Sequence, residues 1–228
     1  MTKRLSYILP LIMALVAVAT ACDSDKQIDG VQDSFRFDMV TYDGYADGCA
    51  LFTYLPRLDG KAIGYSAQMS KEPYIVQGQR VLLNYYLPAE STPSSAERQV
   101  VKVRSFTPVI TNTLRIADEA RIDTMAREHI RLHSIWRTGK YINLHAEVEH
   151  TGKSRWFYLL ADKATWNSDT IDCYLIHNTF GAQAYHWRKA YASYDISAAW
   201  NRPKCKVLRV LLNDEIAKNT HAYCFDKP

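Results

Sequence analysis

The sequence predicts an all-β protein in which a small barrel is followed by an antiparallel β-sandwich, and three observations predict this fold class. Apolar and polar residues alternate with a period of two in many short runs, which is the pattern of half-buried strands. Turn-forming residues separate several of these runs. The runs fall into two groups, on either side of a charged segment at residues 116–128. A chain of this length can bury one large core or two small ones.

The first group predicts a barrel domain over residues 35–115. Four runs alternate as strands do, at residues 34–40, 49–55, 79–87 and 99–106. Asp59 and Gly60 supply a hairpin turn within residues 57–61. Residues 88–96 contain Ser, Thr and Pro and are predicted to form a loop. Short strands at this spacing suit a small barrel or sandwich.

The second group predicts a sandwich domain over residues 116–228. Its first part, residues 116–128, is either one short helix or a connector between the two domains. Seven strand-like runs follow, at residues 129–137, 140–149, 154–161, 170–178, 185–195, 204–212 and 220–225. Seven strands at this spacing suit an antiparallel, immunoglobulin-like β-sandwich.

One hairpin of the sandwich can be predicted residue by residue. In residues 140–149 the even positions 142–148 are apolar and the odd positions are polar or amphipathic. Because directly paired residues share a sheet face, a two-residue loop would match polar residues to apolar ones. We therefore expect a three-residue connection around Thr138 and Gly139, with Gly139 at positive φ. Arg131 then lies opposite Glu147 or His145.

The amino terminus predicts a lipid anchor. Lys3 and Arg4 precede an apolar run, and small residues precede Cys22, a pattern typical of a bacterial lipoprotein signal. We expect residues 1–21 to be removed, Cys22 to carry the lipid, and residues 22–34 to form a flexible tether. A cysteine with two or three acyl chains should keep the protein on its membrane. An ordinary signal peptide that is cut after Ala21 is the alternative.

The charge of the chain argues against nucleic acid as a partner. The signal holds two of the 28 basic residues, so 26 basic residues face 24 acidic ones in the remainder, a net charge of +2. Nucleic-acid binding relies on the neutralisation of phosphates. A nearly neutral body is therefore not expected to bind nucleic acid.

The cysteines leave two interpretations open. Without Cys22, four remain, at positions 49, 173, 205 and 224, and an even number outside the cytosol permits disulfides. Cys205 and Cys224 lie in two strand-like runs that can form a hairpin, so one bridge between them is possible. The alternative is that all four cysteines are small buried side chains.

No residue pattern in the chain carries a known catalytic or metal-binding signature. His129 and His133 have the spacing of zinc ligands on a helix, but no glutamate follows the first histidine. On a strand the two lie about 13 Å apart. His133 can meet His145 across the hairpin, yet two ligands do not make a site. We expect no catalytic residue, no metal and no cofactor.

Aromatic side chains are the candidate partner contacts, namely Tyr85, Tyr86 and Trp187. For Trp187 the alternation of a sandwich core is an equally good explanation. The expected function is that of a non-catalytic binding or assembly module for an envelope protein or a glycan. A secreted hydrolase or a glycan-binding protein whose site is assembled from distant residues is the alternative.

Two stretches, residues 77–85 and 130–144, resemble the NigD-like lipoproteins of Bacteroides-type bacteria. The signal, the two-part β organisation and the total length fit that family. The resemblance implies an OB-like (oligonucleotide/oligosaccharide-binding-like) barrel followed by a β-sandwich. It also implies a lipid on Cys22 and a place on the outer membrane, at its periplasmic face or at the cell surface. The resemblance carries over no catalytic residue.

Overall fold

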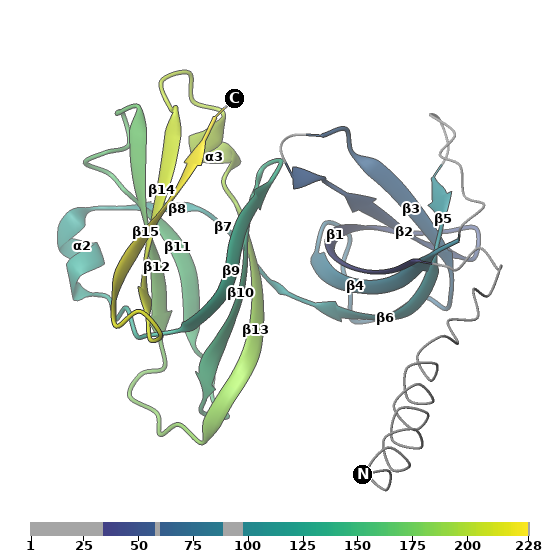
Figure 1. The fold of residues 1–228 in the computed structure, drawn as a ribbon, viewed down its shortest axis with the longest axis horizontal. Helices are drawn as coiled ribbons and strands as arrows, with labels where there is room; N and C mark the ends of the chain where they lie inside the picture. Colours follow the sequence, from purple (N-terminus) through teal and green to yellow (C-terminus); the bar gives the residue numbers. More distant parts are fainter. Residues whose placement is uncertain (1–33, 58–59, 89–97, 228) are drawn as a thin grey trace, which may run out of the picture. The chain divides into compact units, whose positions relative to one another are not determined.

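The structure is a computed structural model that describes residues 34–57, 60–88 and 98–227. The predicted signal, Cys22 and Asp59 lie outside these residues. The described residues belong to one compact unit built from three β-sheets (Figure 1), which confirms the all-β class. None of the helices within the described ranges is long and apolar enough to cross a membrane.

The amino-terminal half is a six-stranded sheet in the order β5-β3-β2-β1-β4-β6. β5 and β6 stand at opposite ends of this order, yet only Val101 separates them along the chain. The sheet therefore curls until its two ends meet, in the partly open manner of an OB-like barrel. Among the described residues no ladder joins β5 to β6, so the barrel is not closed. The strands are β1 (Ser34–Ala46), β2 (Cys49–Tyr54), β3 (Ile63–Gln68), β4 (Arg80–Leu87), β5 (Gln99–Val100) and β6 (Lys102–Pro108).

The curled sheet encloses a core of its own. Val40, Phe52 and Leu83 are fully buried there and pack with buried tyrosines. Strand β3 was missed by the sequence analysis because Gly64 and Ser66 alternate with Tyr65 and Ala67, and small residues give a weak strand signal. β2 and β3 pair antiparallel, with Tyr54 opposite Ile63. The turn predicted between them includes Asp59, which lies outside the described residues.

The carboxy-terminal half is a sandwich of a four-stranded and a five-stranded sheet. The predicted β-sandwich is confirmed, and four of its strand pairs are antiparallel. The prediction did not include the three parallel pairs, which are β7 with β13, β8 with β11 and β12 with β14. The four-stranded sheet has the order β7 (Ile110–Thr113), β13 (His186–Asp195), β10 (Tyr141–His150) and β9 (Arg131–Thr138). The five-stranded sheet has the order β15 (Asn219–Asp226), β14 (Val207–Asp214), β12 (Thr170–Asn178), β11 (Trp156–Asp162) and β8 (Arg115–Ala117).

Alternating apolar residues from both sheets form the sandwich core. On β10, Ile142, Leu144, Ala146 and Val148 all face this core, as their even spacing predicted. Two short helices complete the half, α2 (Glu119–Thr124) and α3 (Ser197–Trp200). α2 lies within residues 116–128, where the sequence left a helix and a connector as alternatives.

The β9–β10 hairpin differs from the prediction in its loop. Thr138 pairs directly with Tyr141, so the loop has two residues rather than three. Its Gly139 has φ 51°, the positive value expected. A register shift between His145 and Ala146 restores the match of polar and apolar faces that a two-residue loop disturbs. Beyond this bulge Arg131 pairs with Glu147, one of the two expected partners.

Candidate functional site

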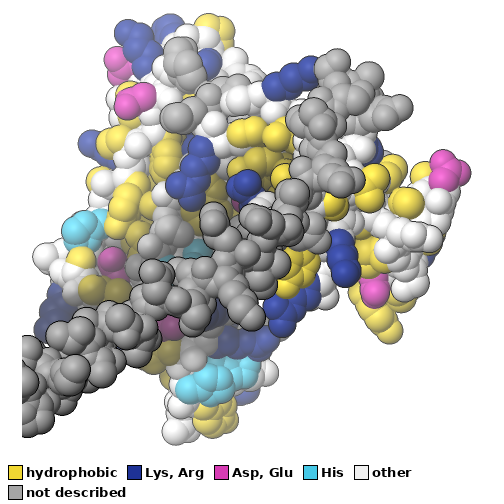
Figure 2. Space-filling model, turned by 45° about the vertical axis from the view of Figure 1, so that its right-hand side comes forward, with side chains coloured by type: hydrophobic (Ala, Val, Ile, Leu, Met, Phe, Trp, Pro, Cys, Tyr) yellow, Lys and Arg dark blue, Asp and Glu magenta, His cyan; other side chains and the backbone are white. Residues whose placement is uncertain are grey.

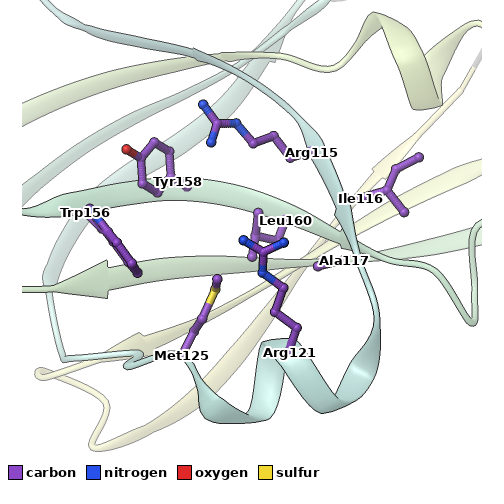
Figure 3. A pocket seen from close by; sticks show the side chains of 8 residues that line it. All are labelled: Arg115, Ile116, Ala117, Arg121, Met125, Trp156, Tyr158 and Leu160. Atoms are coloured by element: carbon purple, nitrogen blue, oxygen red, sulfur yellow. The ribbon is translucent and has the colours of Figure 1, made fainter.

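The candidate site is a pocket on the outer surface of the five-stranded sheet (Figure 3). It has a volume of about 270 Å³, close to the lower end of ligand pockets. Residues from β8, α2 and β11 line it, so segments that are far apart in the sequence meet there. The lining residues are Arg115, Ile116, Ala117, Arg121, Met125, Trp156, Tyr158 and Leu160.

The pocket exists because β11 is apolar on both of its faces. Phe157 and Leu159 point into the sandwich core. Leu160 and its outer neighbour Tyr158 pack instead with Ile122 of α2 in a separate small cluster. α2 is short and covers only the Leu160 end of the strand, so the Trp156 end is left uncovered.

Large apolar side chains surround the uncovered end. Trp156 is 40 % exposed and Phe180 56 %, whereas Ile116, 47 % exposed, lies at the opposite end of the pocket, where β8 pairs with Ala161. The rings of Trp156 and Phe180 meet edge to face with centroids 4.9 Å apart, a favourable geometry for aromatic pairs. We call Arg115, Ile116, Arg121, Met125, Trp156, Tyr158 and Phe180 the Trp156 surface.

The backbone holds Phe180 in an unfavourable conformation. Its φ is +58°, a value that costs a residue other than glycine about 1–2 kcal/mol. The side chain of Asn178 accepts a hydrogen bond of 2.7 Å from the Phe180 amide and supports this turn. The strain keeps an aromatic side chain in solvent beside Trp156, and such strained positions are concentrated at functional sites.

Both arginines of the pocket are exposed, and no acidic side chain of the described residues is paired with them. The Arg115 guanidinium lies over the ring of Tyr158, 4.8 Å from its centroid. Within the described residues neither Arg115 nor Arg121 forms an ion pair, whereas nearby Asp118 is bound by Lys163 at 2.9 Å. Figure 3 shows Arg121 extending from α2 over the pocket. The pocket therefore combines aromatic walls with two uncompensated positive charges.

A second polar centre joins the two halves of the unit. Arg80 of β4 is completely buried and donates hydrogen bonds to Ser193 at 3.2 Å and to Asn143 at 3.3 Å in the four-stranded sheet. It also donates to Thr41 and to the carbonyl of Met39 on β1. All four acceptors are neutral. Burial therefore lowers the pKa of Arg80 to about 10, and the residue serves as a structural clamp.

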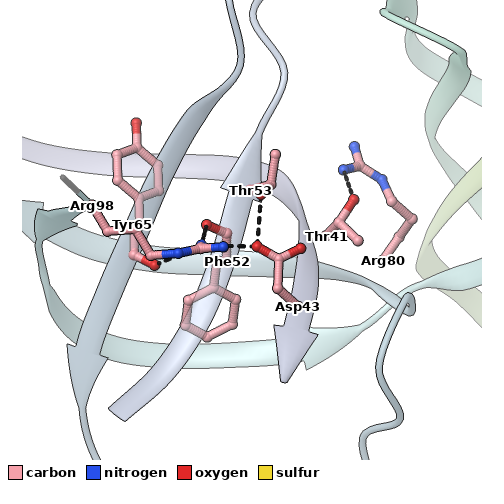
Figure 4. A network of polar contacts seen from close by, with 7 residues as sticks. All are labelled: Thr41, Asp43, Phe52, Thr53, Tyr65, Arg80 and Arg98. Carbon is pink, nitrogen blue, oxygen red and sulfur yellow. Dashed lines mark hydrogen bonds and ion pairs between the residues drawn. The ribbon is translucent and has the colours of Figure 1, made fainter. Parts of the chain in front are cut away.

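A neighbouring network belongs to the curled sheet alone (Figure 4). Arg98 forms an ion pair of 2.8 Å with Asp43 and donates to the carbonyl of Phe52 at 2.7 Å. Thr53 donates a hydrogen bond of 2.6 Å to the same carboxylate. These groups satisfy one another, which indicates a structural role.

The three predicted partner contacts differ in how far they are buried. Tyr85 is buried and its hydroxyl donates to Asp38 at 3.0 Å, so its prediction as an exposed contact was wrong. Tyr86 and Trp187 are partly exposed, and the guanidinium of Arg131 lies 3.9 Å from the Trp187 ring centroid. The residues of the Trp156 surface were missed. The sequence pattern that could have revealed these residues is the unbroken apolar run of β11.

The predicted hairpin that contains Cys224 forms, but Cys205 and Cys224 are not joined by a disulfide. β14 and β15 pair antiparallel, with Cys224 opposite Arg209. Cys205 precedes β14 and is buried, Cys224 is exposed, and both are free. The alternative of four small buried side chains is also incomplete, because Cys224 faces solvent.

The histidines of the β9–β10 hairpin meet as expected. The rings of His133 and His145 stack with centroids 4.7 Å apart, and His145 stacks on Tyr191 at 4.4 Å. In the described ranges no group of three or more His, Cys, Asp or Glu residues is arranged to hold a metal ion.

Charge on the visible surface is mixed. In Figure 2 lysine and arginine side chains lie among hydrophobic ones on the part of the face that is not drawn in grey. This mixture fits the near-neutral composition of the body.

A protein-family model matches the second half of the chain. Residues 113–226 match the model of the NigD-like C-terminal β-sandwich domain. No curated protein matches the chain.

Several solved structures share the fold. A protein of unknown function from Bacteroides vulgatus is 15 % identical, with a TM-score of 0.69 over 86 % of this chain and 92 % of its own. A NigD-like immunity protein from Bacteroides caccae is 19 % identical, with a TM-score of 0.59 over 86 % and 100 %. A candidate lipoprotein from Bacteroides fragilis is 10 % identical, with a TM-score of 0.58 over 85 % and 98 %.

Proposed function

The chain belongs to the family defined by the NigD-like C-terminal β-sandwich domain, and on that premise we propose that it is a non-catalytic envelope protein that binds a partner protein through the Trp156 surface. The similar folds of an immunity protein and a candidate lipoprotein support a binding protein of the envelope. The cysteine-containing signal supports a lipid on Cys22 and a place on the outer membrane.

The observation that carries the proposal is the composition of the Trp156 surface. Protein interfaces are enriched in aromatic residues, Met and Arg, and their energetic centres in Trp, Tyr and Arg. The surface combines Trp156, Tyr158 and Met125 with two arginines around one pocket. Exposed apolar side chains gathered beside a pocket are a mark of an interaction site.

Photocrosslinking in intact cells tests this proposal. The full-length chain carries p-benzoylphenylalanine in place of Phe180, and a matched chain carries it in place of Tyr74, which is 86 % exposed. We expect a discrete protein adduct from position 180 that sediments with the envelope and that is lost when Arg121→Gln is added. Adducts of equal yield from both positions, or none from position 180, would contradict the proposed surface.

The anchor is tested separately by Cys22→Ala in the full-length chain. The variant is expected to move from the membrane fraction to the soluble fraction. Continued sedimentation with the membrane would show that the lipid on Cys22 is not what holds the protein there.

A further inference from the structure

We propose that the Trp156 surface takes a segment of a partner protein in which an acidic side chain stands next to a large apolar one. This inference rests on the proposed function and specifies the chemistry of the partner. The acidic group lies between the guanidinium groups of Arg115 and Arg121, and the apolar group packs against Trp156.

Charge complementarity is the first argument. Arg115 and Arg121 line one pocket, and neither is paired with a carboxylate within the described residues. The acidic side chain beside them, Asp118, is already bound by Lys163. An arginine fork recognises a carboxylate with directed hydrogen bonds. An incoming carboxylate thus provides the anion that the described part of the chain does not provide.

The apolar walls supply the second argument. Leu160 forms part of the pocket lining and is itself buried, while Trp156 and Met125 form the sides. A volume of about 270 Å³ suits one or two side chains rather than a large ligand. An apolar side chain that follows or precedes the acidic one would fill this space and exclude water from the ion pair, which strengthens it.

Other anionic ligands fit the surface less well. Binding to anionic lipid depends on clusters of four to eight basic residues, whereas the pocket has two arginines and Lys163 is paired with Asp118. An acidic sugar would need an open ring face for stacking, but Arg115 lies over the ring of Tyr158 at 4.8 Å and Phe180 packs edge to face with Trp156 at 4.9 Å. A protein segment needs only the carboxylate and one apolar side chain.

Selection of peptides tests the proposal without knowledge of the partner. A random peptide library is selected on the immobilised full-length chain and counter-selected on its Trp156→Ala variant. We expect the retained peptides to place Asp or Glu next to a large apolar residue. Retention without acidic residues would overturn the proposal. The proposal would also be overturned if no peptide bound the full-length chain in preference to its Trp156→Ala variant.

Affinities then connect the acidic group to a particular arginine. In an enriched peptide the Glu→Gln change is expected to weaken binding on the order of tenfold, because a charged hydrogen bond is lost. Arg121→Gln should cause a similar loss for the acidic peptide and little further loss for the Gln peptide. Arg104→Gln, at an exposed arginine on β6, is the matched control and should change neither affinity. Independent effects of the peptide and Arg121 changes would refute the contact.

Fluorine NMR of the chain labelled with 5-fluorotryptophan distinguishes the other ligand classes. The Trp156 resonance, assigned with Trp156→Phe, should shift with the acidic peptide and stay unchanged with glucuronate or phosphatidylglycerol vesicles. A shift with either of the latter and not with the peptide would assign the surface to a sugar or a membrane. If acidic peptides fail while the position-180 crosslink persists, only the partner chemistry is wrong. Loss of the crosslink as well would remove the proposed function.

Discussion

Replacement of Arg80 by lysine should make the stability of the protein depend on pH between about 8 and 10. The native guanidinium is completely buried, lies 4.5 Å from the centroid of the Tyr141 ring and donates to acceptors on both halves of the unit. A lysine keeps the charge in the same environment. Its single ammonium group cannot reach all of these acceptors at once.

The expected size of the effect follows from the pKa of the native residue. Burial lowers the pKa of Arg80 from 12.5 to about 10. A lysine depressed to the same extent would have a pKa of about 8 when folded, against about 10.4 when unfolded. Between these values the unfolded chain binds more protons, so the free energy of unfolding rises with pH. The free energy of unfolding of the variant should rise by up to about 1.4 kcal/mol per pH unit, and by about 3 kcal/mol over the whole range.

Urea denaturation at pH 7, 8, 9 and 10 measures the effect. At pH 7 the Arg80→Lys variant should be about 2–4 kcal/mol less stable than the native protein, because charged hydrogen bonds are lost. This difference in the free energy of unfolding should shrink steadily toward pH 10. Titrating groups that both proteins share contribute equally to the two values and do not affect the difference. Arg104→Lys, at an exposed site, should follow the native protein throughout. A difference that stays constant from pH 7 to 10 would show that the Arg80 site does not disfavour charge.

Three further predictions concern titration and accessibility. Partial burial raises the pKa of Asp195, but hydrogen bonds from Lys140 and Ser197 outweigh it and lower the pKa. Asp195→Asn should therefore lower the free energy of unfolding at neutral pH, and the loss should vanish as pH falls below about 4; a loss independent of pH would refute this. Burial and the nearby Arg155 lower the pKa of His177, so the folded chain resists protonation. The free energy of unfolding should fall as pH drops below about 6.5, and His177→Gln should flatten that fall; an unchanged profile would contradict it. Because Cys224 is exposed and Cys205 buried, a maleimide should label Cys224 within minutes and Cys205 only on unfolding, as mass spectrometry of the folded protein will show. Equal protection of both thiols would point to a bridge.

Strand positions followed from the sequence because alternation reports burial on one face. On β10 the even residues Ile142 to Val148 pack into the sandwich as expected. The odd positions are polar or amphipathic, a pattern typical of an exposed face, yet Tyr141 and Asn143 are buried. Arg80 covers that end of the strand, and it lies 63 residues from Asn143. A local pattern contains no information on which distant element covers the second face of a sheet.

Pairing order was equally hard to predict from local patterns. The sequence identified β12 and β14 as strands, but they pair in parallel, and the chain between them leaves the five-stranded sheet to form β13 and α3. β7 and β8 were missed because they have four and three residues, too few to show a period. Both lie at sheet edges, where pairing partners rather than side chains define a strand.

The Trp156 surface could in part have been predicted, and the physical reason lies in β11. A strand that is apolar on both faces must be covered on both, and Trp156–Asp162 has no polar residue before its final Asp162. The sandwich core covers one face. On the other, α2 packs over Leu160 through Ile122. With only six residues, about 9 Å of helix, α2 cannot reach the Trp156 end of a strand about 23 Å long. The fold therefore leaves one apolar end of β11 uncovered, beside two arginines that are paired with no carboxylate in the described part of the chain.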